Sequence, residues 1–383
     1  MIIKNAYVYT IEEGFVKKDT VIENGYFSEG SRAPQAGETV IDAKEDYLIP
    51  GLVDVHFHGC AGYDFSDGTP EAMAAIGDYE LRSGVTAICP AAMTLSEEML
   101  QGICETAYAY ASDDPSESRG RMVSRLCRIH LEGPFISAEK KGAQNPAYIR
   151  EPDRGMFRRL QEAAHGLVRL ITIAPETAHA MDFIRELHDQ VHISLGHTTS
   201  DYDTAHQAFA LGADHVTHCF NAMPGFTHRA PGVIGAAADA VHVMPELICD
   251  GVHVHPSAVR AAFTLFGGDR MILISDSMRA TGMADGAYTL GGLDVDVKGN
   301  RATLADGTLA GSVTNLMDCM RTAVSMGIPL ETAVRCATYN PAKSIGAESL
   351  YGRIAAGAYG DCVLLSRTGL SVQNVILGGE LVK

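Results

Sequence analysis

The chain has 383 residues, of which 46% are hydrophobic and 20% are charged, so it can bury a large core and fits one big domain with a smaller one. Its formal net charge of -17 excludes nucleic acid and an anionic membrane surface from the expected partners, because both bind basic faces. Three further features predict a soluble, cytoplasmic protein: nine cysteines without a Cys-x-x-Cys pair, no hydrophobic signal core, and no apolar run of the roughly 18 residues that a membrane span needs.

Both ends of the chain predict short β-strands. Apolar and β-branched residues bounded by turn residues place these strands at 2–10, 20–23, 26–29, 361–366, 374–377 and 380–383. Asn24-Gly25 and Gly378-Gly379 supply tight turns between them. We interpret residues 1–50 plus 351–383 as one small β-sandwich domain formed by both chain termini. Two unrelated terminal hairpins are the alternative.

The middle of the chain, residues 51–350, repeats a short apolar strand followed by a segment of helix length. The eight predicted strands span 52–56, 85–90, 128–132, 168–174, 192–196, 215–219, 246–249 and 271–275. The predicted helices include 71–83, 96–111, 153–164, 178–190, 202–211 and 257–266. This alternation predicts an α/β fold, a (β/α)8 TIM-type barrel, with a doubly wound open sheet as the alternative. Glycine-containing turns predict a β-hairpin insertion near residues 282–311.

In such a barrel the catalytic side chains lie at the carboxyl ends of the strands. His56 and His58 follow the first strand, and residues two apart in a strand share a face, so both imidazoles can point at one spot. Later strands end at or near Glu132, His197, His218 and Asp276. Four imidazoles and two carboxylates at one barrel mouth match Zn²⁺ or Fe²⁺ better than Mg²⁺ or Ca²⁺.

Longer stretches around these residues carry a family resemblance. The opening LIPGLVDVHFHG, the order of the candidate ligands and the split β domain resemble the amidohydrolase superfamily of metal-dependent hydrolases. More narrowly, HLEGPF, KKGAQNP, SLGHT, VTHCFNAMPGFTHRAPG, DGVHV and LAGS resemble the N-acetylglucosamine-6-phosphate deacetylase family along nearly the whole chain. This resemblance implies hydrolysis of the acetamide of N-acetyl-D-glucosamine 6-phosphate to D-glucosamine 6-phosphate and acetate, in amino sugar catabolism or recycling.

Three alternatives to this activity stay open. The first is a deacetylase of N-acetylgalactosamine 6-phosphate, the second is another amidohydrolase such as a deaminase, and the third is a non-enzymatic scaffold. A non-enzymatic scaffold would be expected to have lost some of the metal-ligating residues, whereas this chain lacks none of them. The deaminase predicts no anion clamp, whereas the FNAMP stretch and Arg229 offer one. No residue discriminates between the two hexosamine epimers.

The resemblance also assigns roles to individual residues. It implies Glu132, His197 and His218 as metal ligands and Asp276 as the catalytic acid and base. His56 and His58, with a bridging Glu132, make a second metal plausible, so one or two ions per subunit are expected, with Zn²⁺ ahead of Fe²⁺. The substrate contacts that it implies are Ala143, Gln144, Asn221, Ala222, Arg229, His253, Leu309, Ala310 and Gly311. His255, beside His253, stays an alternative at this point.

The chemistry expected of these groups is metal-assisted amide hydrolysis. The metal lowers the pKa of bound water toward about 7 and polarises the acetyl carbonyl. Asp276 takes the proton of the attacking water and passes it to the departing amine. The small-molecule substrate that the resemblance implies is a sugar phosphate. A guanidinium can pair bidentately with phosphate, which suits Arg229 to a phosphate clamp. The resemblance implies a homodimer in which Arg229 reaches the neighbouring active site.

Overall fold

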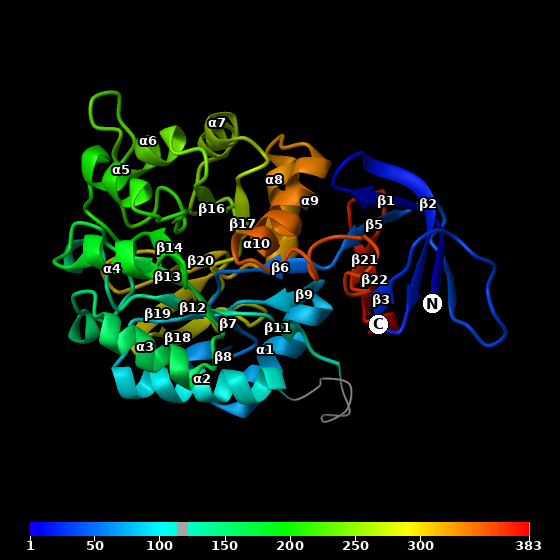
Figure 1. Ribbon diagram of the computed structural model, residues 1–383, viewed down its shortest axis with the longest axis horizontal. Coiled ribbons are helices and arrows are strands. Elements are labelled where there is room, and N and C mark those ends of the chain that lie inside the picture. Colours follow the sequence, from blue (N-terminus) through cyan, green and yellow to red (C-terminus); the bar gives the residue numbers. More distant parts are fainter. Residues whose placement is uncertain (113–121, 383) are drawn as a thin grey trace.

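The structure, a computed structural model, describes residues 1–112 and 122–382 and divides into two parts (Figure 1). The larger part is a ring of parallel strands surrounded by helices. The smaller part is a sheet at one end of the molecule, where the first strands of the chain lie beside the last ones and both termini are found. Lys383, the final residue of the predicted strand 380–383, lies outside the described residues.

The smaller part is built from both chain ends. Its strands are β1 (Ile2–Thr10), β2 (Gly14–Glu23), β3 (Tyr26–Phe27), β4 (Val40–Asp42), β5 (Tyr47–Pro50), β21 (Cys362–Leu365), β22 (Val372–Leu377) and β23 (Glu380–Leu381). They follow the order β23-β22-β21-β5-β1-β2-β3, with β4 beside β1. The sheet joins the two ends of the chain where Leu48 pairs with Leu364 in the antiparallel β5–β21 ladder. The prediction of one terminal β domain is therefore confirmed, and that of two unrelated hairpins is wrong. The residue boundaries of the two domains stay a prediction.

The larger part is the predicted TIM-type barrel. Its eight strand positions are β6 (Leu52–Asp54), β9 (Val85–Ile88), β12 (Ile129–Glu132), β13 (Val168–Ile173), β14 (His192–Leu195), β15 (His215–Val216), β16 (Met244–Ile248) and β17 (Ile272–Ile274). Two short strands complete the pairing between β9 and β12. β10 (Ala91–Ala92), which follows β9, pairs with β12, and β11 (Arg125–Leu126), which precedes β12, pairs with β9. The ring closes beyond β17 and β6, where Asp276 N–H donates to the His56 carbonyl at 2.9 Å and His58 N–H donates to the Ser277 carbonyl at 2.7 Å. An open doubly wound sheet is therefore wrong.

Helices cover the outside of the barrel (Figure 1). They are α1 (Pro70–Arg82), α2 (Glu97–Ser112), α3 (Arg154–Ala163), α4 (Ala180–Leu187), α5 (Tyr202–Ala210), α6 (Gly232–Asp239), α7 (Pro256–Phe266), α8 (Leu316–Ser325), α9 (Leu330–Ala337) and α10 (Tyr339–Ser344). Local chemistry sets where several of them begin. Thr69 caps α1 by accepting a hydrogen bond from Ala72 N–H, and Asp153 caps α3 by accepting from Gly155 N–H. Pro70 and Pro256 occupy first turns, where a missing N–H costs nothing.

Loops at the carboxyl ends of the strands enclose the barrel mouth. After β12 the chain forms two short 3-10 turns, Ala138–Lys140 and Pro146–Tyr148. After β17 it forms an antiparallel sheet of β18 (Gly286–Leu290), β19 (Leu293–Lys298) and β20 (Arg301–Thr303). A further hairpin, β7 (Gly59–Cys60) with β8 (Tyr63–Asp64), follows β6. These connections surround the ends of the strands that carry the candidate ligands.

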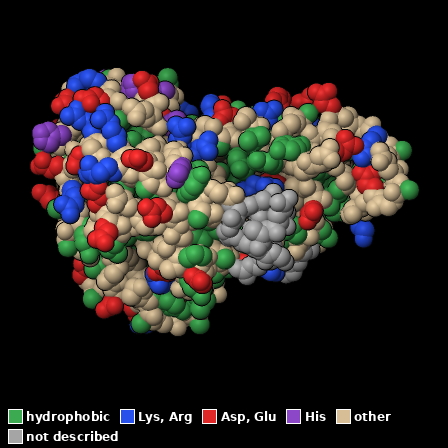
Figure 2. All heavy atoms as spheres, turned by 60° about the horizontal axis from the view of Figure 1, so that its bottom comes forward, with side chains coloured by type: hydrophobic (Ala, Val, Ile, Leu, Met, Phe, Trp, Pro, Cys, Tyr) green, Lys and Arg blue, Asp and Glu red, His purple; other side chains and the backbone are tan. Residues whose placement is uncertain are grey.

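The surface charges, the helix lengths and the state of the cysteines can be compared with the expectations from composition. Figure 2 shows one face of the molecule, on which Lys and Arg side chains are interspersed with Asp and Glu side chains. Across residues 1–112 and 122–382, no helix combines the length and the apolar composition that crossing a bilayer requires. All nine cysteines of the sequence are among the described residues, and each is buried and free.

Candidate active site

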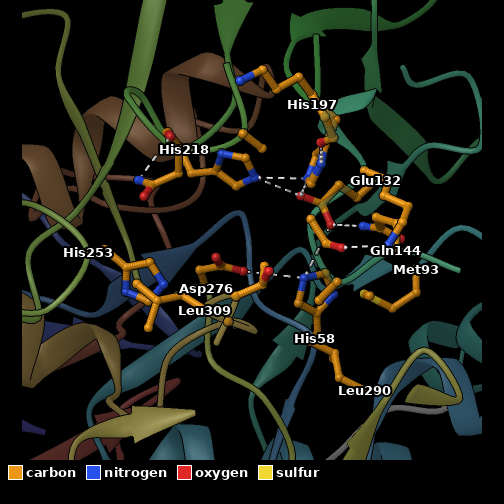
Figure 3. A pocket seen from close by; sticks show the side chains of 18 of the residues that line it. His58, Met93, Glu132, Gln144, His197, His218, His253, Asp276, Leu290 and Leu309 are labelled. Carbon is orange, nitrogen blue, oxygen red and sulfur yellow. Dashed lines mark hydrogen bonds and ion pairs between the residues drawn. The ribbon is translucent and has the colours of Figure 1, made fainter. Parts of the chain in front are cut away.

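The six predicted ligand and catalytic side chains converge at the mouth of the barrel. His56 and His58 follow β6, Glu132 ends β12, and the others follow β14, β15 and β17. Their exposed fractions are between 0% and 7%. They form two adjoining groups, one of Glu132, His197 and His218 and one of His56, His58 and Asp276. Figure 3 shows five of the six facing one another across a cavity.

In the first group the side-chain atoms of all three residues lie within hydrogen-bond distance of one another. Oε1 of Glu132 lies 3.1 Å from Nε2 of His197 and 3.1 Å from Nε2 of His218, and the two ring nitrogens are 3.1 Å apart. Nδ1 of His197 donates to the Lys140 carbonyl at 2.8 Å. Only Nε2 of His197 is therefore left to take a proton or a cation. This hydrogen bond also fixes the orientation of the ring, as such bonds do for metal-ligating histidines.

The second group repeats this arrangement. Nδ1 of His58 donates to the Ala91 carbonyl at 3.0 Å, and Nδ1 of His56 donates to Oε2 of Glu246 at 2.8 Å. Their Nε2 atoms face inward, 3.2 Å and 3.3 Å from the two carboxyl oxygens of Glu132. Oδ1 of Asp276 lies 3.3 Å from Nε2 of His58. Glu132 therefore faces imidazoles of both groups and occupies the position of a bridge.

The electrostatics of the cluster favour positive charge at its centre. Burial lowers the pKa of His58, but the carboxyl groups of Asp276 and Glu132 outweigh it and raise that pKa to about 10. Burial raises the pKa of Glu132 and of Asp276, but the surrounding imidazoles hold both pKa values below their ordinary range. Both acids are therefore anionic at neutral pH. Carboxylate oxygens and inward-facing imidazole nitrogens are the ligand atoms that a divalent transition metal binds.

A second cluster of histidine and aspartate side chains allows a comparison with the barrel mouth. His192, Asp214 and His215 also form a compact cluster, at the start of β14 and β15. There Nδ1 of His192 and Nδ1 of His215 both face Asp214, at 2.5 Å and 3.3 Å. The two rings thus share one carboxylate, which explains this cluster as ion pairs. At the barrel mouth, by contrast, His56, His58 and His197 each donate Nδ1 to a separate acceptor and turn Nε2 toward the cluster, an arrangement typical of metal ligands.

The cavity beside the cluster has a volume of about 460 Å³. The predicted site residues among those that line it are His58, Glu132, Ala143, Gln144, His197, His218, Asn221, Ala222, His253, Asp276, Leu309 and Gly311. Gln144 donates to Oε2 of Glu132 and accepts from Thr94 N–H, so it ties the loop after β12 to the cluster. Residues predicted from several distant segments therefore share one cavity.

Three predicted residues do not line this cavity. His56 has no exposed surface and lies behind the cluster, and Ala310 is likewise fully buried between two residues that do line the cavity. Arg229 lies in the loop between β15 and α6, where its side chain is exposed to solvent. Within one chain, then, Arg229 is not at the cavity, whereas Asn221 and Ala222 of the predicted phosphate clamp are.

His253 and His255 have different environments. His253 lines the cavity, and its Nδ1 donates to Oδ2 of Asp250 at 2.7 Å. Burial lowers the pKa of His253, but the Asp250 carboxylate outweighs it and raises that pKa above its ordinary value. His255 instead caps α7 by accepting a hydrogen bond from Ser257 N–H. The structure therefore separates a cavity histidine from a capping histidine.

The sequence interpretation missed several groups at the site. Lys140 and Lys141 bring cationic side chains to the cavity wall, and Met93 and Leu290 form an apolar part of it beside His58 (Figure 3). Glu246, which holds His56, was also missed. Its signal in the sequence was available, because burying the charge of a glutamate within the apolar strand MPELI is costly unless the charge is paired.

Comparison with known proteins places this site in a family. The chain matches the model described as Amidohydrolase family over residues 47–382. It is 35% identical to the N-acetylglucosamine-6-phosphate deacetylase of Bacillus subtilis (strain 168), over 92% of this chain and 91% of that protein. It is 32% identical to the N-acetylgalactosamine-6-phosphate deacetylase of Escherichia coli O157:H7, over 90% of this chain and 89% of that protein.

Solved structures agree with the sequence matches. One is an aspartate-to-alanine variant of the N-acetyl-D-glucosamine-6-phosphate deacetylase of Mycobacterium smegmatis in complex with N-acetyl-D-glucosamine-6-phosphate. It has a TM-score of 0.90 and 34% identity and covers 100% of this chain and 99% of that chain. The N-acetylglucosamine-6-phosphate deacetylase of Thermotoga maritima has a TM-score of 0.88 and 29% identity, with coverage of 100% and 99%. Since the family model spans most of the sequence and the barrel mouth carries the matching residues, the chain belongs to the amidohydrolase family.

Proposed function

We propose that this amidohydrolase removes the acetyl group of N-acetyl-D-glucosamine 6-phosphate, giving D-glucosamine 6-phosphate and acetate. The observation that carries the proposal is the convergence of Glu132, His197 and His218 on one point, with Asp276 beside them at the wall of the same cavity. The relatives named for this reaction match nearly the whole chain at about one-third identity. The setting is amino sugar catabolism or recycling.

Glu132, His197 and His218 would hold the first metal ion, and His56 and His58, sharing Glu132, would hold a second. Zn²⁺ is the proposed ion and Fe²⁺ the alternative, since imidazole and carboxylate donors suit both. When bound, such an ion supplies Lewis acidity, which polarises an amide carbonyl and makes water a better nucleophile near neutral pH. The chain's own residues supply orientation and proton transfer.

Asp276 performs the proton transfers in this proposal. It is anionic at neutral pH, and its Oδ1 is held 3.3 Å from Nε2 of His58, at the edge of the cavity. A carboxylate in this position accepts a proton from the attacking water. It then donates that proton to the amine nitrogen, which without it would leave as a strongly basic anion.

The phosphate group requires specific donors, because a chain with a formal charge of -17 does not attract a phosphate ester at long range. Asn221, Ala222 and His253 line the cavity and supply amide and imidazole donors. Arg229 is exposed on the loop that follows Asn221 and Ala222, so it is free to contact another subunit. We propose a homodimer in which Arg229 completes the phosphate site of its neighbour.

A second candidate substrate is N-acetyl-D-galactosamine 6-phosphate. It is favoured by the relative from Escherichia coli O157:H7 named for that reaction, whose 32% identity is close to the 35% of the glucosamine enzyme. A cytoplasmic setting is part of the proposal for either substrate. The nine buried free cysteines fit a reducing compartment.

The decisive experiment measures acetate release from a panel of N-acetylated sugars. The panel contains both 6-phosphorylated epimers and their unphosphorylated forms, and the enzyme is stripped of metal and reconstituted with Zn²⁺ or Fe²⁺. We expect the highest kcat/KM for N-acetyl-D-glucosamine 6-phosphate. A higher value for the galactosamine epimer would reassign the substrate, and no acetate from any member would refute a deacetylase.

A further inference from the structure

A buried carboxylate lies behind the candidate ligands and contacts both of their groups. Glu246, in β16, has no exposed surface. Its Oε2 accepts a hydrogen bond from Nδ1 of His56 at 2.8 Å and a second from the backbone N–H of His218 at 3.2 Å. A buried carboxylate is costly unless it is paired, so these two contacts are the interactions that retain Glu246 in the barrel interior.

The contact with His56 commits one nitrogen of its ring. A carboxylate only accepts hydrogen bonds, so Nδ1 of His56 carries a proton, and Nε2 alone remains for a cation. Nε2 faces the cluster and lies 3.2 Å from Oε1 of Glu132. A carboxylate behind a ligating imidazole fixes the ring and makes it a stronger electron donor, and removing such a partner typically weakens metal binding 10- to 100-fold.

The contact with His218 holds a strained segment of backbone. His218 has a φ of 26°, a left-handed value that disfavours any residue with a Cβ. The side chain of Glu246 accepts from His218 N–H, and its backbone carbonyl accepts from Cys219 N–H at 2.8 Å. Glu246 thus stabilises the bend that aims the His218 ring at Glu132 and His197.

We propose that Glu246 is a positioning residue that couples the two metal positions, through the ring of His56 at one and the backbone of His218 at the other. The inference rests on the proposed metal-dependent function and adds a residue on which metal occupancy depends. Because the coupling to His56 acts on the ring itself, the second position depends on the charge of Glu246 more strongly than the first.

The test uses Glu246→Gln, which keeps the size of the side chain and one oxygen able to accept from both donors. The new amide nitrogen replaces Oε1, which has no hydrogen-bond partner within residues 1–112 and 122–382. Metal-free wild type and variant are titrated with Zn²⁺ against a competing chelator. We expect the dissociation constant of the second ion to rise about 10- to 100-fold and that of the first to rise less.

Glu80→Gln is the matched control. Glu80 is another glutamate without exposed surface, but it lies on α1, and its hydrogen-bonding neighbour is the thiol of Cys60 rather than an imidazole. This variant should bind Zn²⁺ as the wild type does. An equal loss of affinity in both variants would mean that any buried glutamate has this effect, and it would overturn the inference.

A double-mutant cycle separates positioning from general stability. If Glu246 acts on the second ion through His56, then Glu246→Gln in a His56→Ala background should cause no further loss at that position. Additive losses would overturn the inference. Circular dichroism checks the fold of each variant. Should Glu246→Gln not fold, Glu246→Asp keeps the charge but shortens the reach by one methylene group. We expect Glu246→Asp to weaken the second ion as well, and wild-type affinities would refute the role.

Acetate release by the metal-loaded wild type distinguishes a failure of this inference from a failure of the proposed function. An active wild type with unchanged Zn²⁺ binding in Glu246→Gln would refute the positioning role and leave the deacetylase intact. A metal-loaded wild type that releases no acetate would refute the deacetylase, whatever the variant binds. Unchanged Zn²⁺ stoichiometry in His56→Ala plus His58→Ala would refute the second metal position and the coupling with it.

Discussion

Replacing Glu80 by Gln should stabilise the protein at alkaline pH and have little effect at acidic pH. Glu80 is fully buried on α1, where its carboxyl group has only the weakly donating thiol of Cys60 beside it among the described residues. Burial, followed by the nearby negative charge of Asp54, raises the pKa of Glu80 from 4.5 to about 8. The native protein therefore keeps this proton at pH 7, whereas the unfolded chain loses it near its ordinary pKa.

The sign of the effect follows from proton binding. Between about pH 4.5 and 8 the native state binds more protons than the unfolded state, so this group makes the stability fall as pH rises through that window. Above both pKa values the loss is complete. A pKa shift of this size corresponds to a decrease in the free energy of unfolding on the order of a few kcal/mol. Gln does not titrate, so the variant escapes this loss.

The assay is thermal unfolding of the metal-free wild type and Glu80→Gln at a fixed scan rate between pH 5 and 8.5. The Tm difference should be near zero at pH 5 and grow to about 5 °C at pH 8.5. The pKa shift from 4.5 to about 8 corresponds to roughly 5 kcal/mol. An unfolding entropy of about 2.1 cal/mol/K per residue makes each kcal/mol worth roughly 1 °C in a chain of this length. Glu105→Gln, on the exposed face of α2, should show no trend. A Tm difference that does not change with pH would refute the reasoning.

Three predictions concern the site. Removal of metal to a level verified by elemental analysis should abolish acetate release, and full turnover of the stripped protein would contradict a metal held by Glu132 and its two histidine partners. Asp276→Asn preserves size but removes the proton acceptor, so kcat should fall at least ~10²-fold with KM retained; near-normal turnover would assign the proton transfers to another group. Arg229→Ala should cost about 1.5 to 3 kcal/mol in kcat/KM for the phosphorylated substrate and almost nothing for the unphosphorylated sugar. If Arg229 acts across the interface, mixing Arg229→Ala subunits with Asp276→Asn subunits should restore activity, because one site of each mixed dimer is then intact; a clamp within one subunit predicts no recovery.

Much of the site could be predicted because its signals are local. The spacing of His56 and His58 places both rings on one face, as strand geometry requires, and each of the other candidate ligands ends or follows a short apolar strand. In a parallel barrel such ends meet at one mouth, so identifying the strands was enough to bring Glu132 and Asp276 together. The terminal sheet was predictable for a similar reason, since alternating residues and Asn-Gly or Gly-Gly turns act over a few positions.

Contacts between distant segments required the tertiary structure. Glu246 and His56 are separated by 190 positions, and only closure of the barrel brings them within 2.8 Å. Likewise, His253 and His255 are only two positions apart in the sequence, but the start of α7 decides that one faces the cavity and the other caps a helix.

The sequence by itself determined the strand pattern, the ligand types and their order along the chain. These depend on periodicity and turn chemistry within a few residues. The tertiary structure decided which polar groups lose contact with water. It left Arg229 in solvent, enclosed Glu80 beside the weakly donating thiol of Cys60 and paired Glu246 with His56. Burial of a charge depends on every element packed around it, so no local pattern specifies it.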